Sequence, residues 1–126
     1  MARRSSSHPT EVELEILQIL WEEGPSTVRD VHNRLNTDKQ TQYSTTVKML
    51  LVMLEKGLVK RDDSIRPQIY QAVPKQKQVQ KRLLQDLIQK AYDGSAKNLL
   101  LQAISSAKSS KEDLEEIRNL IDEMTD

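Results

Sequence analysis

Residues 42–70, QYSTTVKMLLVMLEKGLVKRDDSIRPQIY, contain the stretch that decides the fold. They open with a polar helix start at Tyr43–Thr46 and continue as an apolar helix, which Gly57 is suited to end in a left-handed cap. Two runs rich in strand formers follow, Leu58–Arg61 and Gln68–Ala72, with the polar connection Asp62–Pro67 between them. A helix, a glycine stop and a hairpin in this order predict the end of a winged helix-turn-helix unit. Its helix can enter a DNA major groove while the hairpin touches flanking phosphates.

Two further helices are predicted before this stretch. The first runs from a capping box formed by Thr10 and Glu13 to the Gly24-Pro25 pair, and the second runs from a cap at Ser26 or Thr27 to about residue 35. Helical spacing predicts the inward-facing positions as Leu14, Leu17 and Trp21, with Leu20 beside them, in the first helix and Val28, Val31 and Leu35 in the second. A turn at residues 36–38 leads toward the helix of the deciding stretch.

That third helix, for which Thr41 is a candidate cap, is apolar on nearly every side. Periodicity alone leaves two buried stripes open. One consists of Thr46, Met49, Leu50 and Met53, and the other consists of Val47, Leu50, Leu51 and Leu54.

From Pro74 onward the composition changes to helix formers. Helices are predicted at residues 75–92, about 95–108 and 110–124, with Asp93-Gly94 between the first two and a cap at Ser109 or Ser110 before the third. Three helices of this total length bury too little surface for a secure independent core, yet they carry substantial apolar stripes. A second copy of the chain is the simplest partner for these stripes, and folding back onto the winged helix is the alternative. The expected dimerisation residues are Leu83, Leu87, Leu99, Leu100, Ile104, Leu114, Ile117, Leu120 and Ile121.

The expected fold is therefore mainly α with a small β-hairpin wing. It comprises a flexible N-terminal arm at residues 1–9, a winged-helix DNA-binding domain at residues 10–74 and a helical dimerisation region at residues 75–126. Arg3 and Arg4 in the arm are candidates for a minor-groove contact, and a disordered arm is the alternative.

Charge is distributed unevenly in this chain of 126 residues, although its formal net charge is zero. Residues 25–61 carry seven basic and three acidic side chains, and residues 98–126 carry three basic and seven acidic ones. A basic middle suits a DNA-contacting face, whereas chance clustering on a solvated surface is the alternative. The absence of cysteine excludes disulfides and thiolate ligands. No apolar run of membrane length or signal peptide is evident, so a soluble cytoplasmic protein without membrane contact is expected.

The start of the third helix offers side chains suited to reading bases. Gln can bind adenine, Thr offers a hydroxyl and a methyl group, and Lys reaches guanine or phosphate. Alternatively, Ser44 and Thr45 only help to cap the helix. The candidates for base contact are Gln42, Tyr43, Ser44, Thr45 and Lys48. The candidates for phosphate contact are Arg29 at the start of the second helix and Lys60, Arg61 and Arg66 on the wing, where solvated hairpin charges are the alternative.

No pattern indicates an enzyme, a metal site or a cofactor. The chain has no Gly-rich phosphate loop and no arrangement of nucleophile and base, and neither His8 nor His32 has a second ligand at metal spacing. Trp21, Tyr70 and Tyr92 are interpreted as structural aromatic residues.

Several stretches of the chain, taken together and in order, resemble one known family. They are Ile19–Val31, Tyr43–Lys48, Glu55–Val59, Arg66 four residues before Tyr70, and Ala91–Ser95 followed by an acidic helix with a Leu-x-x-Ile-x-x-Leu-Ile pattern. The sequence is similar to the penicillinase-repressor family, which includes the β-lactam-resistance repressors BlaI and MecI and the copper-responsive CopY repressors. The resemblance implies a homodimeric winged-helix repressor that binds a palindromic operator. It also favours the stripe of Thr46, Met49, Leu50 and Met53, which turns Thr45 and Lys48 outward.

Two departures from the family pattern concern the inducing signal. The resemblance implies cleavage at an Asn-Phe bond in the β-lactam branch, but this chain carries Gln102-Ala103 at that spacing from the Gly94 turn. The Cys-x-Cys pairs of the copper branch are absent as well. A signalling protease or another inducer therefore stays open. A winged-helix module that binds protein and not DNA is the alternative function.

Overall fold

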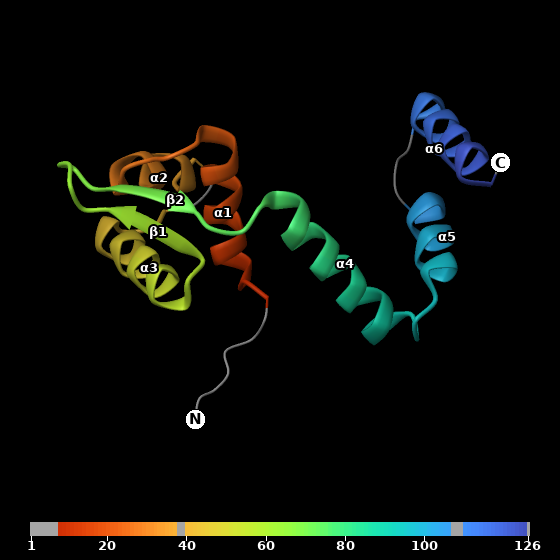
Figure 1. The fold of residues 1–126 in the computed structure, drawn as a ribbon, viewed down its shortest axis with the longest axis horizontal. Helices are drawn as coiled ribbons and strands as arrows, with labels where there is room; N and C mark the ends of the chain where they lie inside the picture. Colours follow the sequence, from red (N-terminus) through yellow and green to blue (C-terminus); the bar gives the residue numbers. More distant parts are fainter. Residues whose placement is uncertain (1–7, 38–39, 107–109, 126) are drawn as a thin grey trace. The chain divides into compact units, whose positions relative to one another are not determined.

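The computed structural model describes residues 8–37, 40–106 and 110–125. Along the chain lie helices α1 (Glu11–Glu23), α2 (Val28–Leu35) and α3 (Tyr43–Lys56), strands β1 (Val59–Asp62) and β2 (Ile69–Ala72), and helices α4 (Gln76–Ala91), α5 (Ala96–Ser106) and α6 (Lys111–Thr125) (Figure 1). This mostly helical architecture with one antiparallel hairpin confirms the predicted fold class. The chain divides into two compact units, one up to Leu83 and one from Leu84 onward, so their boundary falls within α4. The expected domain boundary between residues 74 and 75 stays a prediction.

Helices α1 and α2 both begin with a complete capping box. The Thr10 hydroxyl accepts the Glu13 amide at 3.2 Å, and the Glu13 carboxylate accepts the Thr10 amide at 2.9 Å. Thr27 and Asp30 make the same reciprocal pair at 3.1 Å each. Because each pair satisfies two otherwise free donors, these residue types fix where the helices start. The Thr10–Glu13 prediction is confirmed, and Thr27 is the cap of α2.

The predicted cap of α3 at Thr41 is wrong. Gln42 holds the N-cap position and makes no side-chain capping bond. The Asn36 side chain instead brackets Thr41, accepting its amide at 2.8 Å and donating to its carbonyl at 3.0 Å. The backbone of Thr41 is thereby held to the end of α2, which leaves the next residue to open the helix.

The end of α3 agrees with the prediction. Gly57 has a φ of 82° in the left-handed region, its amide bonds the Leu54 carbonyl at 3.1 Å, and the Leu58 amide bonds the Met53 carbonyl at 2.9 Å. These two bonds form a Schellman motif, which satisfies carbonyls that the helix leaves free. Since the Leu58 amide is used in this cap, β1 starts at Val59, one residue later than predicted.

The core of the first unit is built from helices α1, α2 and α3 and the two strands of the hairpin. Helix α1 packs on α2 and β2, and α3 packs on α2 and β1. The buried apolar residues of this cluster are Ile16, Leu17, Ile19, Leu20, Val31, Leu35, Leu50, Met53, Val59 and Tyr70. Tyr70 is confirmed as a structural residue, and Trp21 packs against the cluster while its indole N–H donates to the Pro74 carbonyl at 3.0 Å.

The burial tests the single stripe predicted for α1 and the two alternative stripes left open for α3. In α1 the predicted stripe is partly wrong, because Ile16, Ile19 and Leu20 are buried with Leu17 whereas Leu14 is only half-buried. The hairpin and α2 cover α1 from two sides, so the buried face is broader than one row of positions. In α3, Thr46, Leu50 and Met53 are buried while Leu51 is 45% exposed, which confirms the stripe favoured by the family resemblance.

The wing is a two-stranded antiparallel hairpin that joins the loop between α1 and α2. Val59 pairs with Ala72, and Arg61 pairs with Tyr70. Ser26 exchanges two backbone hydrogen bonds with Tyr70, at 2.9 and 2.7 Å, outside the named strands. The predicted connection starts one residue too early, because Asp62 still belongs to β1.

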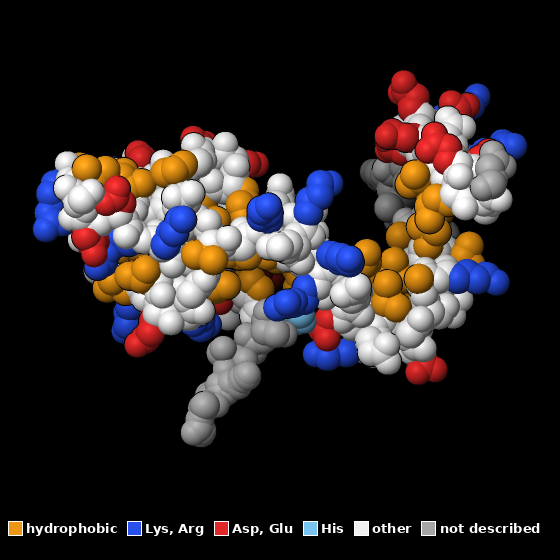
Figure 2. Space-filling view, viewed as in Figure 1, with side chains coloured by type: hydrophobic (Ala, Val, Ile, Leu, Met, Phe, Trp, Pro, Cys, Tyr) orange, Lys and Arg blue, Asp and Glu red, His pale blue; other side chains and the backbone are white. Residues whose placement is uncertain are grey.

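The second unit holds its apolar side chains at the surface. No residue of α5 or α6 is buried within the described ranges, and Leu101 and Leu120 are each 56% exposed. Figure 2 shows hydrophobic side chains over α5 and acidic ones over α6. Asp93 and Gly94 form the predicted turn after α4, both with positive φ, and Ser110 caps α6 through the Asp113 amide at 3.0 Å.

Some predictions fall on residues outside the described ranges. They concern Arg3 and Arg4 of the N-terminal arm, the turn at Asp38 and the alternative cap at Ser109. Among the helices of the described residues, none has the length and apolar content to cross a membrane.

Candidate nucleic-acid interface

The first turn of α3 presents its polar side chains to solvent. Thr46, Leu50 and Met53 point into the core, and helical geometry then turns the neighbouring positions outward. Tyr43 is 38% exposed. The predicted base-reading residues Gln42, Tyr43, Ser44, Thr45 and Lys48 are all exposed. The structure thus brings all five to the N-terminal end of a single helix, where Thr45 and Lys48 lie one turn apart.

This helix start differs electrostatically from the starts of α1 and α2. The first turns of α1 and α2 carry acidic side chains, Glu11 and Glu13 in one and Asp30 in the other, whereas the first turn of α3 carries none. Free amide groups and the helix dipole make a helix start partly positive. The start of α3 therefore keeps a positive end that no carboxylate of its own turn offsets, which suits a polyanion.

Three elements that are distant in sequence converge beside this face. A surface hollow of about 500 Å³ lies between the starts of α2 and α3 and the wing. Arg29 comes from α2, Tyr43 from α3 and Arg66 from the wing. The lining residues are Thr27, Val28, Arg29, Tyr43, Arg66, Pro67 and Gln68. The fold thereby gathers two exposed guanidinium groups next to the start of α3.

Arg29 is oriented by an aromatic ring. Its guanidinium lies over the ring of Tyr43 at 4.3 Å from the centroid, and the same ring meets the imidazole of His32 edge to face at 5.2 Å. A cation stacked on an aromatic face is attracted by the ring quadrupole and loses conformational freedom. The Tyr43 ring therefore holds the Arg29 guanidinium beside the start of α3.

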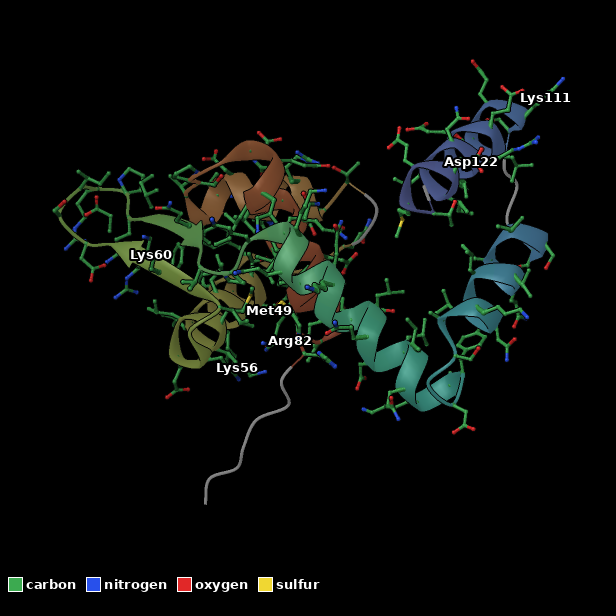
Figure 3. All side chains as sticks on the ribbon, turned by 45° about the vertical axis from the view of Figure 1, so that its right-hand side comes forward. Met49, Lys56, Lys60, Arg82, Lys111 and Asp122 are labelled. Atoms are coloured by element: carbon green, nitrogen blue, oxygen red, sulfur yellow. The ribbon has the colours of Figure 1, made fainter. Side chains whose placement is uncertain are left out.

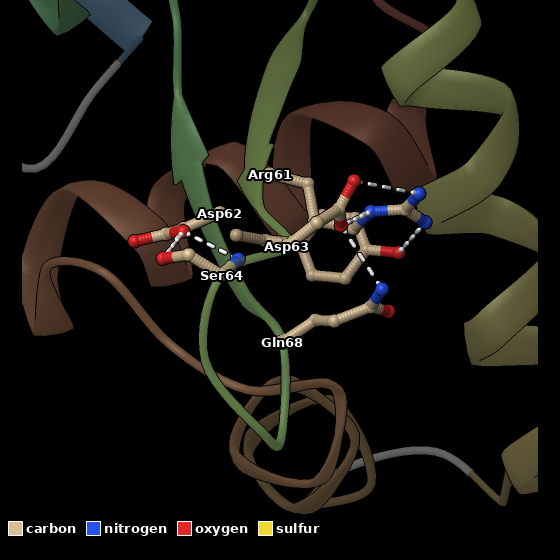
Figure 4. A network of polar contacts seen from close by, with 6 residues as sticks. Arg61, Asp62, Asp63, Ser64 and Gln68 are labelled. Atoms are coloured by element: carbon tan, nitrogen blue, oxygen red, sulfur yellow. Dashed lines mark hydrogen bonds and ion pairs between the residues drawn. The ribbon is translucent and has the colours of Figure 1, made fainter.

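The wing holds Arg61 differently from the other basic candidates. Its guanidinium contacts the Asp63 carboxylate at 2.5 and 3.4 Å and the Tyr70 hydroxyl at 3.4 Å (Figure 4). Hydrogen bonding to Tyr70 and then to Asp63 raises the pKa of Arg61. The same Asp63 oxygen accepts from Gln68 across the hairpin at 2.9 Å. Arg61 thus helps to tie the wing together, and its charge is partly compensated within the chain.

Lys60 and Arg66 have no such partner among the described residues. Lys60 is exposed on β1, as Figure 3 shows, and Arg66 is exposed in the connection before β2. Nearby, the side chain and amide of Ser64 both donate to Asp62, which lowers the pKa of the Asp62 carboxyl. The acids of the wing are therefore engaged locally, while these two cations remain available.

Comparison with known proteins agrees with this geometry. The sequence profile of the family described as "Penicillinase repressor" matches residues 9–123. The chain belongs to the penicillinase repressor family. It is similar to the methicillin resistance regulatory protein MecI of Staphylococcus aureus strain N315 and to that of Staphylococcus epidermidis, with 19% identity over 109 residues in each case. The alignments cover 86% of this chain and 89% of each relative.

A solved structure supports the fold independently. A MarR family protein from Bacillus stearothermophilus matches with a TM-score of 0.52 and 24% identity, covering 94% of this chain and 76% of that chain. The winged-helix architecture is thus shared with a structure of low sequence similarity. Penicillinase repressors are transcriptional regulators and not a class of enzymes, so this chain is placed among DNA-binding repressors.

Sequence reasoning missed several polar groups behind the exposed face of this chain. His32 and Thr46 are buried and bond each other at 2.9 Å, and Asn36 bonds both His32 and Thr41. Glu13 is buried and pairs with Lys56 at 2.7 Å. The spacing of His32 and Asn36, four residues apart on one helix, is a signal that could have revealed their contact. The helical spacing of Thr46 with Leu50 and Met53 is a second signal.

Proposed function

We propose that this chain acts in the cytoplasm as a dimeric transcriptional repressor that occupies a palindromic operator. The observation that carries the proposal is the two-sided character of α3, with a fully buried face at Thr46, Leu50 and Met53 and an exposed polar face at its start. A helix that is rigidly seated in a core and polar outside is suited to enter a major groove. The family membership supports the same conclusion.

In this proposal the exposed turn of α3 reads the bases. Thr45 and Lys48 lie one turn apart on the outward face, and Gln42 and Ser44 flank them at the helix start. Short polar side chains there bring hydroxyl, amide and ammonium groups to the edges of base pairs. The acid-free first turn of α3 favours its approach to the phosphate-lined groove.

The surrounding cations position the protein on the phosphates. Arg29 and Arg66 line one hollow from opposite elements, so they are suited to hold the backbone beside the groove that α3 enters. Lys60 is exposed on the wing and offers a further contact. Arg61 contributes less, because Asp63 already engages it.

The dimer is proposed to form through α4, α5 and α6. Leu87 on α4, Leu100 on α5 and Ile121 on α6 are 49%, 41% and 45% exposed, and α5 and α6 bury no described residue. Residues 75–97 carry six basic and two acidic side chains, whereas residues 98–126 carry three basic and seven acidic ones. Opposite charges around uncovered apolar stripes favour packing of these helices against a second copy. A two-fold dimer would match a palindromic site.

The signal that ends repression is left open. Gln102 and Ala103 lie within helix α5, where Gln102 accepts a hydrogen bond from the Tyr92 hydroxyl at 3.2 Å. A signalling protease acting at another bond and a small-molecule inducer are both compatible with the proposal.

The proposal is tested by titrating the full-length protein into fluorescent DNA from upstream of its own gene and into a scrambled duplex, at several salt concentrations. We expect tighter binding to the upstream DNA and affinity that falls steeply with salt, because phosphate neutralisation releases counterions. The double variant Thr45→Ala/Lys48→Ala should lose the preference, whereas Lys111→Ala on α6 should keep it. Equal affinity for both duplexes would overturn the proposal, and capture of a protein partner without DNA would favour the interaction-module alternative.

A further inference from the structure

A buried polar cluster joins α2 to the start of the recognition helix α3. His32 is 9% exposed and Thr46 is fully buried. The imidazole Nδ1 lies 2.9 Å from the Thr46 hydroxyl, and the imidazole Nε2 lies 2.9 Å from the Asn36 side-chain nitrogen. None of these three residues is among those proposed to contact bases or phosphates.

The hydrogen bonds of Asn36 determine which way its amide faces. Its oxygen accepts the Thr41 amide at 2.8 Å, and its nitrogen donates to the Thr41 carbonyl at 3.0 Å. A backbone amide can only donate and a backbone carbonyl can only accept, so the amide cannot be reversed without losing both bonds. The Asn36 nitrogen is therefore the atom that faces His32.

This orientation assigns the tautomer of His32. An amide nitrogen only donates, so the imidazole Nε2 beside it must accept and carries no proton. The proton of the neutral ring then sits on Nδ1 and is donated to the Thr46 hydroxyl. The first turn of α3 is thus bonded to the His32 ring, and the segment before α3 is bonded to the Asn36 amide that orients this ring.

The cluster continues to the outer surface. The His32 ring meets the Tyr43 ring at 5.2 Å with an interplanar angle of 81°, and Arg29 stacks on Tyr43 at 4.3 Å. Thr46 immediately follows Thr45 and lies half a turn from Lys48, which are two of the proposed base-reading residues. A directional bond at Thr46 restricts rotation of α3 about its axis, which apolar packing alone restrains less.

We propose that His32 is a positioning residue that sets the rotation of α3 for base discrimination, through its bond to Thr46 and with its tautomer held by Asn36. This inference rests on the proposed DNA-binding function. Base readout depends on bidentate geometry at groove edges, so a small rotation of the helix weakens discrimination while phosphate contacts persist. His32 therefore acts on specificity without touching DNA.

The test replaces both bonded partners by apolar groups in the full-length protein. Exchanging both members of a buried pair for apolar groups of similar shape leaves no orphaned donor between them. The Asn36 nitrogen loses His32 as an acceptor, but this side chain is half-buried and keeps its bond to the Thr41 carbonyl, so His32→Leu/Thr46→Val should melt close to the wild type. The ratio of affinities for upstream and scrambled DNA should nevertheless fall about tenfold or more. Affinity for scrambled DNA and the salt dependence should stay unchanged. Asn33→Ala, an exposed position on the same helix, is the matched control and should keep the ratio.

The outcomes separate this inference from the proposed function. A wild type that does not prefer its upstream DNA overturns the proposed function and the inference together. If the wild type prefers its upstream DNA and the double variant keeps the same ratio of affinities, the inference alone is overturned. Nitrogen NMR of the imidazole provides a readout independent of DNA, and it should show Nδ1 protonated and Nε2 unprotonated. A proton found on Nε2 would contradict the assigned tautomer.

Discussion

The winged-helix unit and the helices that follow it differ in how far their apolar side chains are buried. In the first unit, Ile16, Leu17, Val31, Leu50 and Met53 have no exposed surface at all. In the second, α5 and α6 bury no described residue, although they are as rich in leucine and isoleucine. The first unit therefore completes a core within one chain, whereas the second carries apolar stripes that its own helices leave uncovered.

The two regions also differ in their buried polar groups. The first unit contains Glu13 and His32, both hydrogen-bonded inside the fold, while the polar groups of α6 face solvent. Buried polar groups demand specific partners and so fix a single arrangement. The proposed roles, DNA reading by the first unit and pairing with a second copy by the second, would have these different requirements.

The largest expected effect tests the completeness of the first core. Leu50→Ala should lower the free energy of unfolding by about 2–5 kcal/mol, because it leaves a cavity at a fully buried site. Chemical denaturation followed by circular dichroism measures the change. Leu51→Ala, at the adjacent position that is 45% exposed, should change the free energy by less than about 1 kcal/mol. Equal losses in both variants would refute the assigned buried face of α3.

The second prediction addresses the uncovered stripes. Leu120→Asp should weaken self-association by about 2–3 kcal/mol, because it removes apolar surface and places a charge in the proposed interface. Sedimentation equilibrium measures the dissociation constant. Asn119→Asp adds the same charge to the neighbouring position of α6 and should leave association nearly intact. If both variants, or neither, dissociate, the stripe is not the contact surface.

The third prediction concerns the buried carboxylate of the first unit. Burial acts to raise the pKa of Glu13, but hydrogen bonds from Lys56 and from Thr10 outweigh it, and the pKa lies below its ordinary value of 4.5. A folded-state pKa below the unfolded one contributes stability above pH 4.5, and this contribution is lost as the pH falls through the folded value. Glu13→Gln should therefore be about 1–2 kcal/mol less stable at pH 7, since Lys56 is 34% exposed and partly screened.

That difference between Glu13→Gln and the wild type should shrink on acidification, as measured by denaturation at several pH values. Glu116→Gln on the exposed α6 is the matched control and should show no comparable difference at any pH. A stability gap for Glu13→Gln that is constant down to acid pH would argue against a depressed pKa.

The smallest expected effect tests the proposed phosphate contacts of the first unit through the salt dependence of DNA binding. Arg66→Gln should reduce the slope of log affinity against log salt by about one, because one phosphate contact is lost. Arg61→Gln should reduce it less, since Asp63 compensates that charge. Lys111→Gln on α6 removes a charge from the second unit and should not alter the slope. Titrations of upstream DNA across salt concentrations measure all three, and an altered slope for Lys111→Gln would extend the DNA interface beyond the winged helix.

Local signals in the sequence were sufficient for most of the fold. Capping boxes, Gly57 and strand-forming runs placed the helices and the hairpin within one or two residues, because these features act over a single turn of chain. The exposed face of α3 also followed, once the family resemblance had chosen between two equally periodic stripes. The contact roles of its residues stay predictions.

The errors occurred in the loop before α3 and in the wing, where neighbouring polar side chains choose among several partners. Thr41 looked like a cap, but Asn36 from the end of α2 holds its backbone. Arg61 looked like a free cation, but Asp63 and Tyr70 engage it. These partners are two to nine residues apart, but which of them pair depends on the path of the loop and hairpin backbone, which residue types alone do not encode.

Residue patterns alone established the order of the elements, the neutral balance of a chain with a basic middle, and the family. The folded arrangement was needed to show that His32 is buried against Thr46 and that Arg29 and Arg66 line one hollow. The physical reason is that helix starts and stops arise from bonds between residues a few positions apart. The burial of a side chain and the meeting of residues at one site instead arise from packing between segments that lie far apart in the sequence.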